Sequence, residues 1–177
     1  MKKFLTIIGI IVTFFVFYFL QANFFTWFNI AGIMPNLFII LTLFIGLFIG
    51  KKLGFVLGLI FGIYLDFLVA KSVGFSGVML ALVGLAAEYL DKNFSKDSRI
   101  TIILIVMGST IFYEIGMYIF QILKWGIAIE ILPFLRILAI EAFFQIILVI
   151  ILYPMIQKVG GIVEEAFKNK VVSTRYF

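Results

Sequence analysis

Long apolar runs, separated by short polar segments, divide the chain into six parts. The runs approach the ~20 residues that an α-helix needs to cross the hydrocarbon of a bilayer, and such runs are typical of transmembrane helices. They predict spans at residues 4–20, 36–50, 53–70, 76–90, 100–123 and 134–156. We therefore expect an all-α integral membrane protein, with a six-helix transmembrane bundle over residues 1–156 and both termini on one side of the membrane.

Capping residues mark several span ends. Asn36, Ser76 and Ser98 stand where the second, fourth and fifth spans begin, and Asn and Ser side chains accept backbone N–H groups at such positions. The second to fourth spans have only about 15 to 18 residues, or ~22 to 27 Å of helix, so they barely cross the hydrocarbon. Short spans favour a closely packed bundle.

Basic residues lie mostly on one side of this topology. With the N-terminus inside, 11 Lys and Arg residues fall on the cytoplasmic side, whereas Lys71, Lys124 and Arg136 fall outside. This asymmetry follows the rule that cytoplasmic loops carry the excess of positive charge. Both termini are therefore expected in the cytoplasm.

The amino-acid composition excludes several classes of protein and of functional site. The chain of 177 residues is 64% hydrophobic and 13% charged, which is more apolar sequence than a soluble domain of this size buries. It contains neither His nor Cys, so disulfides, thiolate nucleophiles, imidazole chemistry and the usual zinc sites are excluded. The net charge of +5 is spread between the apolar runs, so we expect orientation in the bilayer and no nucleic-acid partner.

Five glycines recur every fourth residue, but they belong to two helices. Lys51 and Lys52 separate Gly46 and Gly50 from the later three, which predicts an antiparallel hairpin with almost no loop. The remaining stripe consists of Gly54, Gly58 and Gly62. Small side chains at this spacing let another helix approach closely. The stripe is expected to serve helix packing, either within the bundle or with a helix of a partner protein.

Two segments outside the apolar cores have distinct compositions. Residues 21–35 carry no charge but contain Phe24, Phe25, Trp27 and Phe28, a composition suited to the membrane interface or to a re-entrant or partner-binding segment. Residues 157–177 are too short for a second domain. Apolar residues at helical spacing predict a cytoplasmic amphipathic helix there.

Acidic residues inside the spans are the main polar feature. Glu88 precedes Lys92 by four residues, a spacing that favours an interfacial ion pair. Asp66 lies near the outer end of the third span, at a depth comparable to that of Arg136. A cross-helix ion pair between Asp66 and Arg136 is expected, with Lys71 as the alternative partner.

Glu114 and Glu141 lie deepest, on consecutive antiparallel spans. If they face each other, one is expected to hold a proton, because two carboxylates in a low-dielectric site do not both stay ionised. A proton relay or substrate site is one interpretation. The simpler one is a neutral or paired group that holds helices together, for which Gln145, four residues after Glu141, offers a hydrogen-bond partner.

Sequence motifs for catalysis are absent. The chain has no glycine-rich phosphate loop, no metalloprotease helix motif, no nucleophile elbow and no acidic metal-binding loop. We therefore expect no enzymatic activity and no cofactor.

Three segments resemble the MreD family of bacterial rod shape-determining membrane proteins. They are MPNLFIIL at the start of the second span, GFVLGLIFGIYLDFL in the third, and SVGFSGVMLALVG leading into the fourth. The resemblance covers residues 35–90 well and the remainder by hydropathy alone. Asn36 departs from the family pattern, which often has an acidic residue after the proline.

The resemblance implies a non-enzymatic scaffold in the bacterial inner membrane. Its implied partner is MreC, within the machinery for cell-wall elongation. That machinery also contains RodA, a class B penicillin-binding protein and, as indirect partners, MreB filaments. A homodimer of this chain within the complex is a further possible arrangement. The family is similar in fold to the S components of energy-coupling-factor vitamin transporters. A transporter subunit is therefore the alternative function, although the first span offers only Gly9 and Thr13 as small residues at docking spacing.

Overall fold

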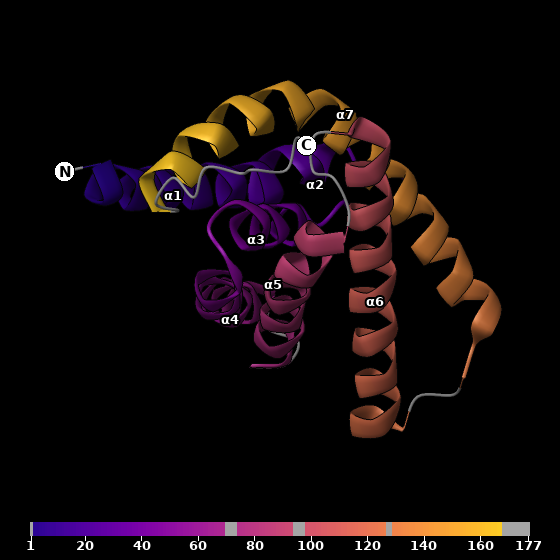
Figure 1. Cartoon of the computed structure of the whole chain (residues 1–177). Coiled ribbons are helices and arrows are strands. Elements are labelled where there is room, and N and C mark those ends of the chain that lie inside the picture. Colours follow the sequence, from indigo (N-terminus) through magenta and orange to yellow (C-terminus); the bar gives the residue numbers. More distant parts are fainter. Residues whose placement is uncertain (1, 70–73, 94–97, 127–128, 168–177) are drawn as a thin grey trace.

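The computed structural model describes residues 2–69, 74–93, 98–126 and 129–167, and these residues are helical apart from short connections (Figure 1). This confirms the all-α prediction. Six helices have 12 or more residues: α1 (Lys2–Phe19), α3 (Leu37–Phe48), α4 (Lys51–Val69), α5 (Phe75–Asn93), α6 (Arg99–Trp125) and α7 (Ile131–Phe167). A π-helical turn, η1 (Leu20–Phe24), and one α-helical turn, α2 (Phe25–Trp27), extend α1.

Within the described residues, three helical segments are long and apolar enough to cross a membrane. They are Phe4–Trp27, Arg99–Trp125 and Ile131–Phe167, and two shorter apolar helices, Leu37–Phe48 and Phe75–Ala87, accompany them. The chain is therefore a helical protein with several apolar helices, as expected of a multi-pass membrane protein. That all six helices span the bilayer stays a prediction.

Helix α3 forms the centre of the fold. All of its residues are buried, and it contacts α1, α4, α5, α6 and α7. A helix that is apolar on every side has no face for water, so it is stable only when surrounded by other helices. The remaining helices therefore assemble around α3.

Polar groups at the start of α3 hold this centre in place. The Asn36 side chain accepts a hydrogen bond from the N–H of Phe38 at 3.1 Å, which confirms the predicted cap. Gln21 adds a second acceptor, because its Oε1 accepts from the N–H of Leu37 at 3.0 Å. Ser98 caps α6 as predicted, whereas Ser76 does not precede its helix, since α5 already begins at Phe75.

Helix α7 extends further than the predicted sixth span. It includes Pro154 and continues to Phe167 as one element, and it bends so that its second half runs beside α1 instead of α6 (Figure 1). A proline inside a helix removes one backbone hydrogen bond and commonly produces such a bend. The segment predicted as a surface helix thus packs in part on α3, because a Cβ at Gly160 would meet the ring of Phe48 at 2.5 Å. Residues 168–177 of that segment lie outside the described residues.

Candidate functional site

The glycine stripe on α4 lies against helices of the same chain. A Cβ at Gly54 would lie 2.8 Å from the Cα of Gly46 and 2.8 Å from the carbonyl oxygen of Gly84. A Cβ at Gly58 would lie 2.6 Å from the carbonyl oxygen of Leu80. Real Cβ atoms do not approach backbone this closely, so each position requires glycine.

The third member of the stripe meets another glycine. A Cβ at Gly62 would overlap the backbone of Gly77 on α5, so α4 and α5 pack backbone to backbone at this point. The close packing that the spacing predicts is therefore present, and it joins helices of one chain. Here the structure departs from the expectation of a partner's helix, because α5 already occupies the stripe.

The aromatic segment at the end of α1 divides into a buried and an exposed part. Phe25 is buried, whereas Phe24, Trp27 and Phe28 are exposed, Trp27 at 87% of its surface. The rings of Phe24 and Phe28 stack with their centroids 4.6 Å apart. Three aromatic side chains are thus available to the membrane interface or to a partner, while Phe25 anchors the segment.

Asp66 is buried and accepts hydrogen bonds from the backbone. Its Oδ2 accepts from the N–H of Gly74 at 2.7 Å and from the N–H of Ser76 at 3.0 Å. These N–H groups belong to the start of α5, where the helix has no internal acceptors for them. Asp66 therefore ties the end of α4 to the beginning of α5.

The predicted ion pair of Asp66 with Arg136 is not present among the residues that the structure describes. Arg136 lies on an exposed face of α7, and the backbone N–H groups supply the donors that Asp66 needs. The correction has a local cause, because the N–H groups of Gly74 and Ser76 at the start of α5 already occupy the Asp66 carboxylate. The alternative partner Lys71, and the side chains of Glu88 and Lys92, lie outside the described part of the chain.

The structure brings Glu114 and Glu141 together in the interior. Their carboxyl groups are hydrogen-bonded to each other, and Glu141 is buried. Two carboxyl groups form a hydrogen bond only when one of them carries a proton, because ionised carboxylates have no donor. The pair thus links α6 to α7 through one shared proton.

Other polar side chains continue this contact across the helices. Tyr113, next to Glu114, is hydrogen-bonded to Ser76 on α5, whose backbone N–H in turn binds Asp66. Tyr113, Ser76 and Asp66 thus connect α6, α5 and α4, as the need of buried polar groups for partners requires. The Glu114–Glu141 pair separately connects α6 to α7. Tyr113 was not identified from the sequence and Ser76 was predicted only as a helix cap, because a single hydroxyl carries little signal.

Gln145 extends the polar interior to α3. It is fully buried, and its Nε2 donates to the carbonyl oxygen of Asn36 at 2.8 Å. The partner predicted for Gln145 was Glu141, but the backbone carbonyl before α3 accepts the hydrogen bond from its amide instead. Within the described residues, Gln145 Oε1 and Thr42 Oγ1 are buried without a protein hydrogen-bond partner.

A cleft of about 420 Å³ separates α5 from α6. Its walls are apolar or small: Val83, Ala86 and Leu90 on α5, and Thr101, Leu104, Ile105, Gly108, Ser109 and Phe112 on α6. A Cβ at Gly108 would meet nothing within 4 Å. This glycine is therefore not required by packing within the chain, in contrast to the stripe on α4. Gly108 stands outside the glycine stripe, so glycine spacing did not indicate this cleft.

Comparison with known proteins gives one match. The sequence model for "rod shape-determining protein MreD" matches residues 1–159. No curated protein and no solved structure matches the chain.

Proposed function

The chain belongs to the MreD family of rod shape-determining proteins, and from this membership we propose that it is a scaffold that binds MreC within the cell-wall elongation machinery. Membership makes the chain a non-enzymatic membrane protein of the shape-determining machinery, located in the inner membrane. The family match over 159 residues is the observation that supports the proposal. RodA, a class B penicillin-binding protein and a second copy of the chain would join the same complex, with MreB as an indirect partner.

The cleft between α5 and α6 is the surface that suits a transmembrane helix of MreC. Helices in membranes associate where small side chains let their backbones approach, and Ala86, Gly108 and Ser109 line this cleft. Glycine inside a helix costs about 1 kcal/mol relative to alanine, so an unpacked glycine calls for an explanation outside the chain. The open space at Gly108 is explained if a partner's helix lies against it.

The exposed aromatic side chains supply a second contact at the other end of the scaffold. Phe24, Trp27 and Phe28 are exposed beyond the end of α1, and aromatic residues are enriched at protein interfaces. We place the part of MreC that follows its transmembrane helix against them. Both termini of the chain then lie in the cytoplasm, as the distribution of basic residues predicts.

Replacing Gly108 with leucine tests the helix contact. Gly108→Leu fills the cleft and should reduce co-purification with MreC by about tenfold, which corresponds to ~1.4 kcal/mol. Gly9→Leu is the matched control, because Gly9 also has open space around it but lies on α1. Equal recovery of MreC with both variants would contradict the proposed docking site.

A transporter subunit of the S-component type is the second candidate. The polar groups in the interior, Glu114 and Glu141 among them, are the observation that favours it. However, neither of the two clefts described in this structure is lined by these residues, so the scaffold is the better supported function. Calorimetry with a panel of vitamins on the purified protein distinguishes the two, since binding would favour the transporter.

A further inference from the structure

The amide oxygen of Gln145 is a buried acceptor without a protein donor among the residues that the structure describes. The side chain is fully buried, and its Nε2 already donates to the carbonyl oxygen of Asn36 at 2.8 Å. An amide oxygen accepts hydrogen bonds and donates none, so only a donor can satisfy it. Gln145 therefore marks a position in the interior that suits a hydrogen-bond donor.

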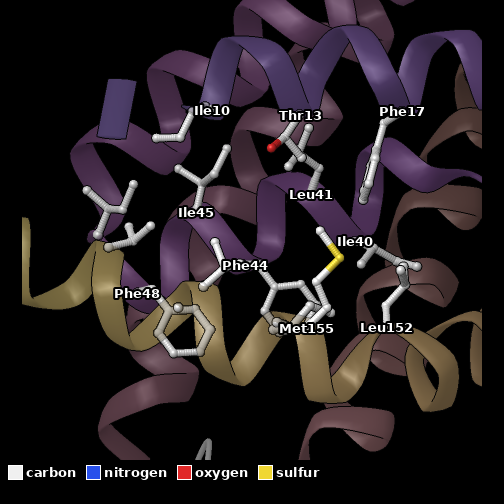
Figure 2. Close-up of a pocket in the computed structure, with 15 residues that line it drawn as sticks. Ile10, Thr13, Phe17, Ile40, Leu41, Phe44, Ile45, Phe48, Leu152 and Met155 are labelled. Carbon is white, nitrogen blue, oxygen red and sulfur yellow. The ribbon is translucent and has the colours of Figure 1, made fainter. Parts of the chain in front are cut away.

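The groove between α1, α3 and the C-terminal half of α7 does not supply this donor (Figure 2). It has a volume of about 140 Å³, and Gln145 is not among its lining residues. Thr13 is the one lining residue with a polar side chain, and its hydroxyl donates to the carbonyl oxygen of Gly9 at 2.8 Å. The nearer candidates are the residues beside Gln145 on the buried face of α7.

The ionisable residue on that face is Glu141. Before Pro154, the buried residues of α7 are Glu141, Gln145 and Val149, which follow one another at intervals of one helical turn. Side chains four positions apart on a helix are neighbours and can touch. A carboxyl group that carries a proton is a hydrogen-bond donor. A protonated Glu141 is therefore placed to donate to Gln145.

A single proton does not serve both contacts of Glu141. The proton that Glu114 and Glu141 share is used in the hydrogen bond between them. The pair then keeps one negative charge in the interior, where an ion without a partner is costly. A second proton on Glu114 removes this charge and lets Glu114 donate to Glu141. The O–H of Glu141 is then available to Gln145.

The groups around the pair are acidic or neutral in the described part of the chain. The Tyr113 hydroxyl on α6 lies in the field of both carboxyl groups and of Asp66 on α4. Helix α3 and residues 75–87 of α5 contain no ionisable side chain. Arg136 on α7 is exposed, and no described basic side chain acts on the pair. A bound proton thus meets no competing positive charge there.

The pair lies closer to one end of its helices than to the other. Glu114 precedes the end of α6 at Trp125 by 11 residues, and Glu141 follows the start of α7 at Ile131 by 10. Both are therefore roughly 15 Å from the connection between α6 and α7, whereas the start of α6 at Arg99 is roughly 22 Å from Glu114. Glu114 is also only partly buried. A proton has the shorter path from the side of this connection, through Glu114.

We propose that Glu114, Glu141 and Gln145 form a binding site for two protons, which enter from the side of the α6–α7 connection. One proton joins the two carboxyl groups and so links α6 to α7. A second proton passes from water to Glu114, and the hydrogen bonds then continue through Glu141 and Gln145 to α3. The site shares no residue with the cleft between α5 and α6, so this proposal and the binding of MreC succeed or fail separately.

Infrared spectroscopy counts the bound protons, because a protonated carboxyl group has a C=O stretching band that an ionised group lacks. Spectra of the detergent-solubilised, full-length protein are recorded at about pH 8 and about pH 5, a range that covers buried carboxyl groups. Glu114→Gln is the reference, since its Glu141 holds one proton at both values. On lowering the pH, the wild type should gain the band of one more carboxylic acid group than Glu114→Gln. Equal gains in the two proteins would overturn the proposal.

Gln145→Met tests the amide oxygen as the acceptor of the second proton. Methionine is a flexible side chain that fills the space without an acceptor oxygen, so the additional band should be absent at about pH 5. A band as strong as that of the wild type would overturn the proposal. If Gln145→Met does not fold, the comparison with Glu114→Gln decides alone.

Sodium is the competing ligand for such a set of oxygen atoms. The spectra are therefore repeated at constant pH with sodium chloride in place of choline chloride. The carboxylic acid bands should be the same in both salts. Loss of a band in sodium chloride would identify a metal cation in place of the second proton and overturn the proposal.

Discussion

At the scale of single residues, Asp66 shows how this fold accommodates a buried carboxylate. It is 4% exposed, and its charge is balanced by two backbone N–H groups at the start of α5. Such charge-assisted hydrogen bonds are roughly twice as strong as neutral ones. The residue therefore serves as a structural connection between two helices, and no cation is needed beside it.

Removing this carboxylate should destabilise the protein. Asp66→Ala leaves two N–H groups without an acceptor, and each unsatisfied group costs about 1–3 kcal/mol. For a chain of this size, about 1 kcal/mol corresponds to a fall of roughly 2–4 °C in the unfolding midpoint. Circular dichroism of the detergent-solubilised variant measures the unfolding midpoint. Arg136→Gln is the control and should leave the midpoint unchanged. A comparable fall in this variant would support an ion pair between Asp66 and Arg136 instead.

The carboxyl pair on α6 and α7 permits a second test. Glu141→Gln keeps a hydrogen-bond donor toward Glu114 and should change the free energy of unfolding by less than about 1 kcal/mol, whereas Glu141→Ala removes the contact and should cost more. Thermal unfolding of both variants is the measurement. A glutamine variant as unstable as the alanine variant would show that one shared proton does not describe the pair.

At the scale of helices, glycines inside different helices have different roles. Gly62 lies on the backbone of α5, whereas the space around Gly108 is empty. The same residue type thus serves packing in one helix and leaves a surface open in another. What separates them is the neighbouring helix, which spacing along the chain does not reveal.

This difference predicts that alanine substitutions at the two glycines change the stability of the protein in opposite directions. Gly62→Ala forces a methyl group against Gly77 and should destabilise the protein by about 1–3 kcal/mol. Gly108→Ala meets no atom within 4 Å and should stabilise it by up to about 1 kcal/mol through helix propensity. Unfolding midpoints of the two variants provide the comparison, and a shared direction would contradict the assigned packing.

At the scale of the whole molecule, single cysteines test the membrane topology. The positive-inside distribution predicts that single cysteines at Lys52 and Lys158 face the cytoplasm and that one at Glu130 faces the outside. In intact spheroplasts, a membrane-impermeant maleimide should label Glu130→Cys only, and all three after permeabilisation. Labelling of the first two in intact cells would invert the topology.

Much of the helical layout follows from the sequence. The predicted spans and the observed helices agree closely at α3, α4 and α5, because apolar runs end at local signals such as the Asn36 cap and the Lys51–Lys52 pair. The segment after residue 156 was predicted as an amphipathic surface helix from its apolar spacing, and the structure shows it as the last part of α7, which ends at Phe167. Its packing on α3 at Gly160 could not be predicted, because spacing along one helix does not reveal which helix lies beside it.

Local sequence by itself determined the class of the protein, the number of long helices and their approximate ends. These depend on apolar runs and caps, which act over a few neighbouring residues. Only the tertiary structure decided that α5 occupies the glycine stripe, that Asp66 binds backbone in place of Arg136, and that clefts open at α5–α6 and beside α3. Those features depend on which helices meet, and contacts between distant segments are settled by packing of the whole chain.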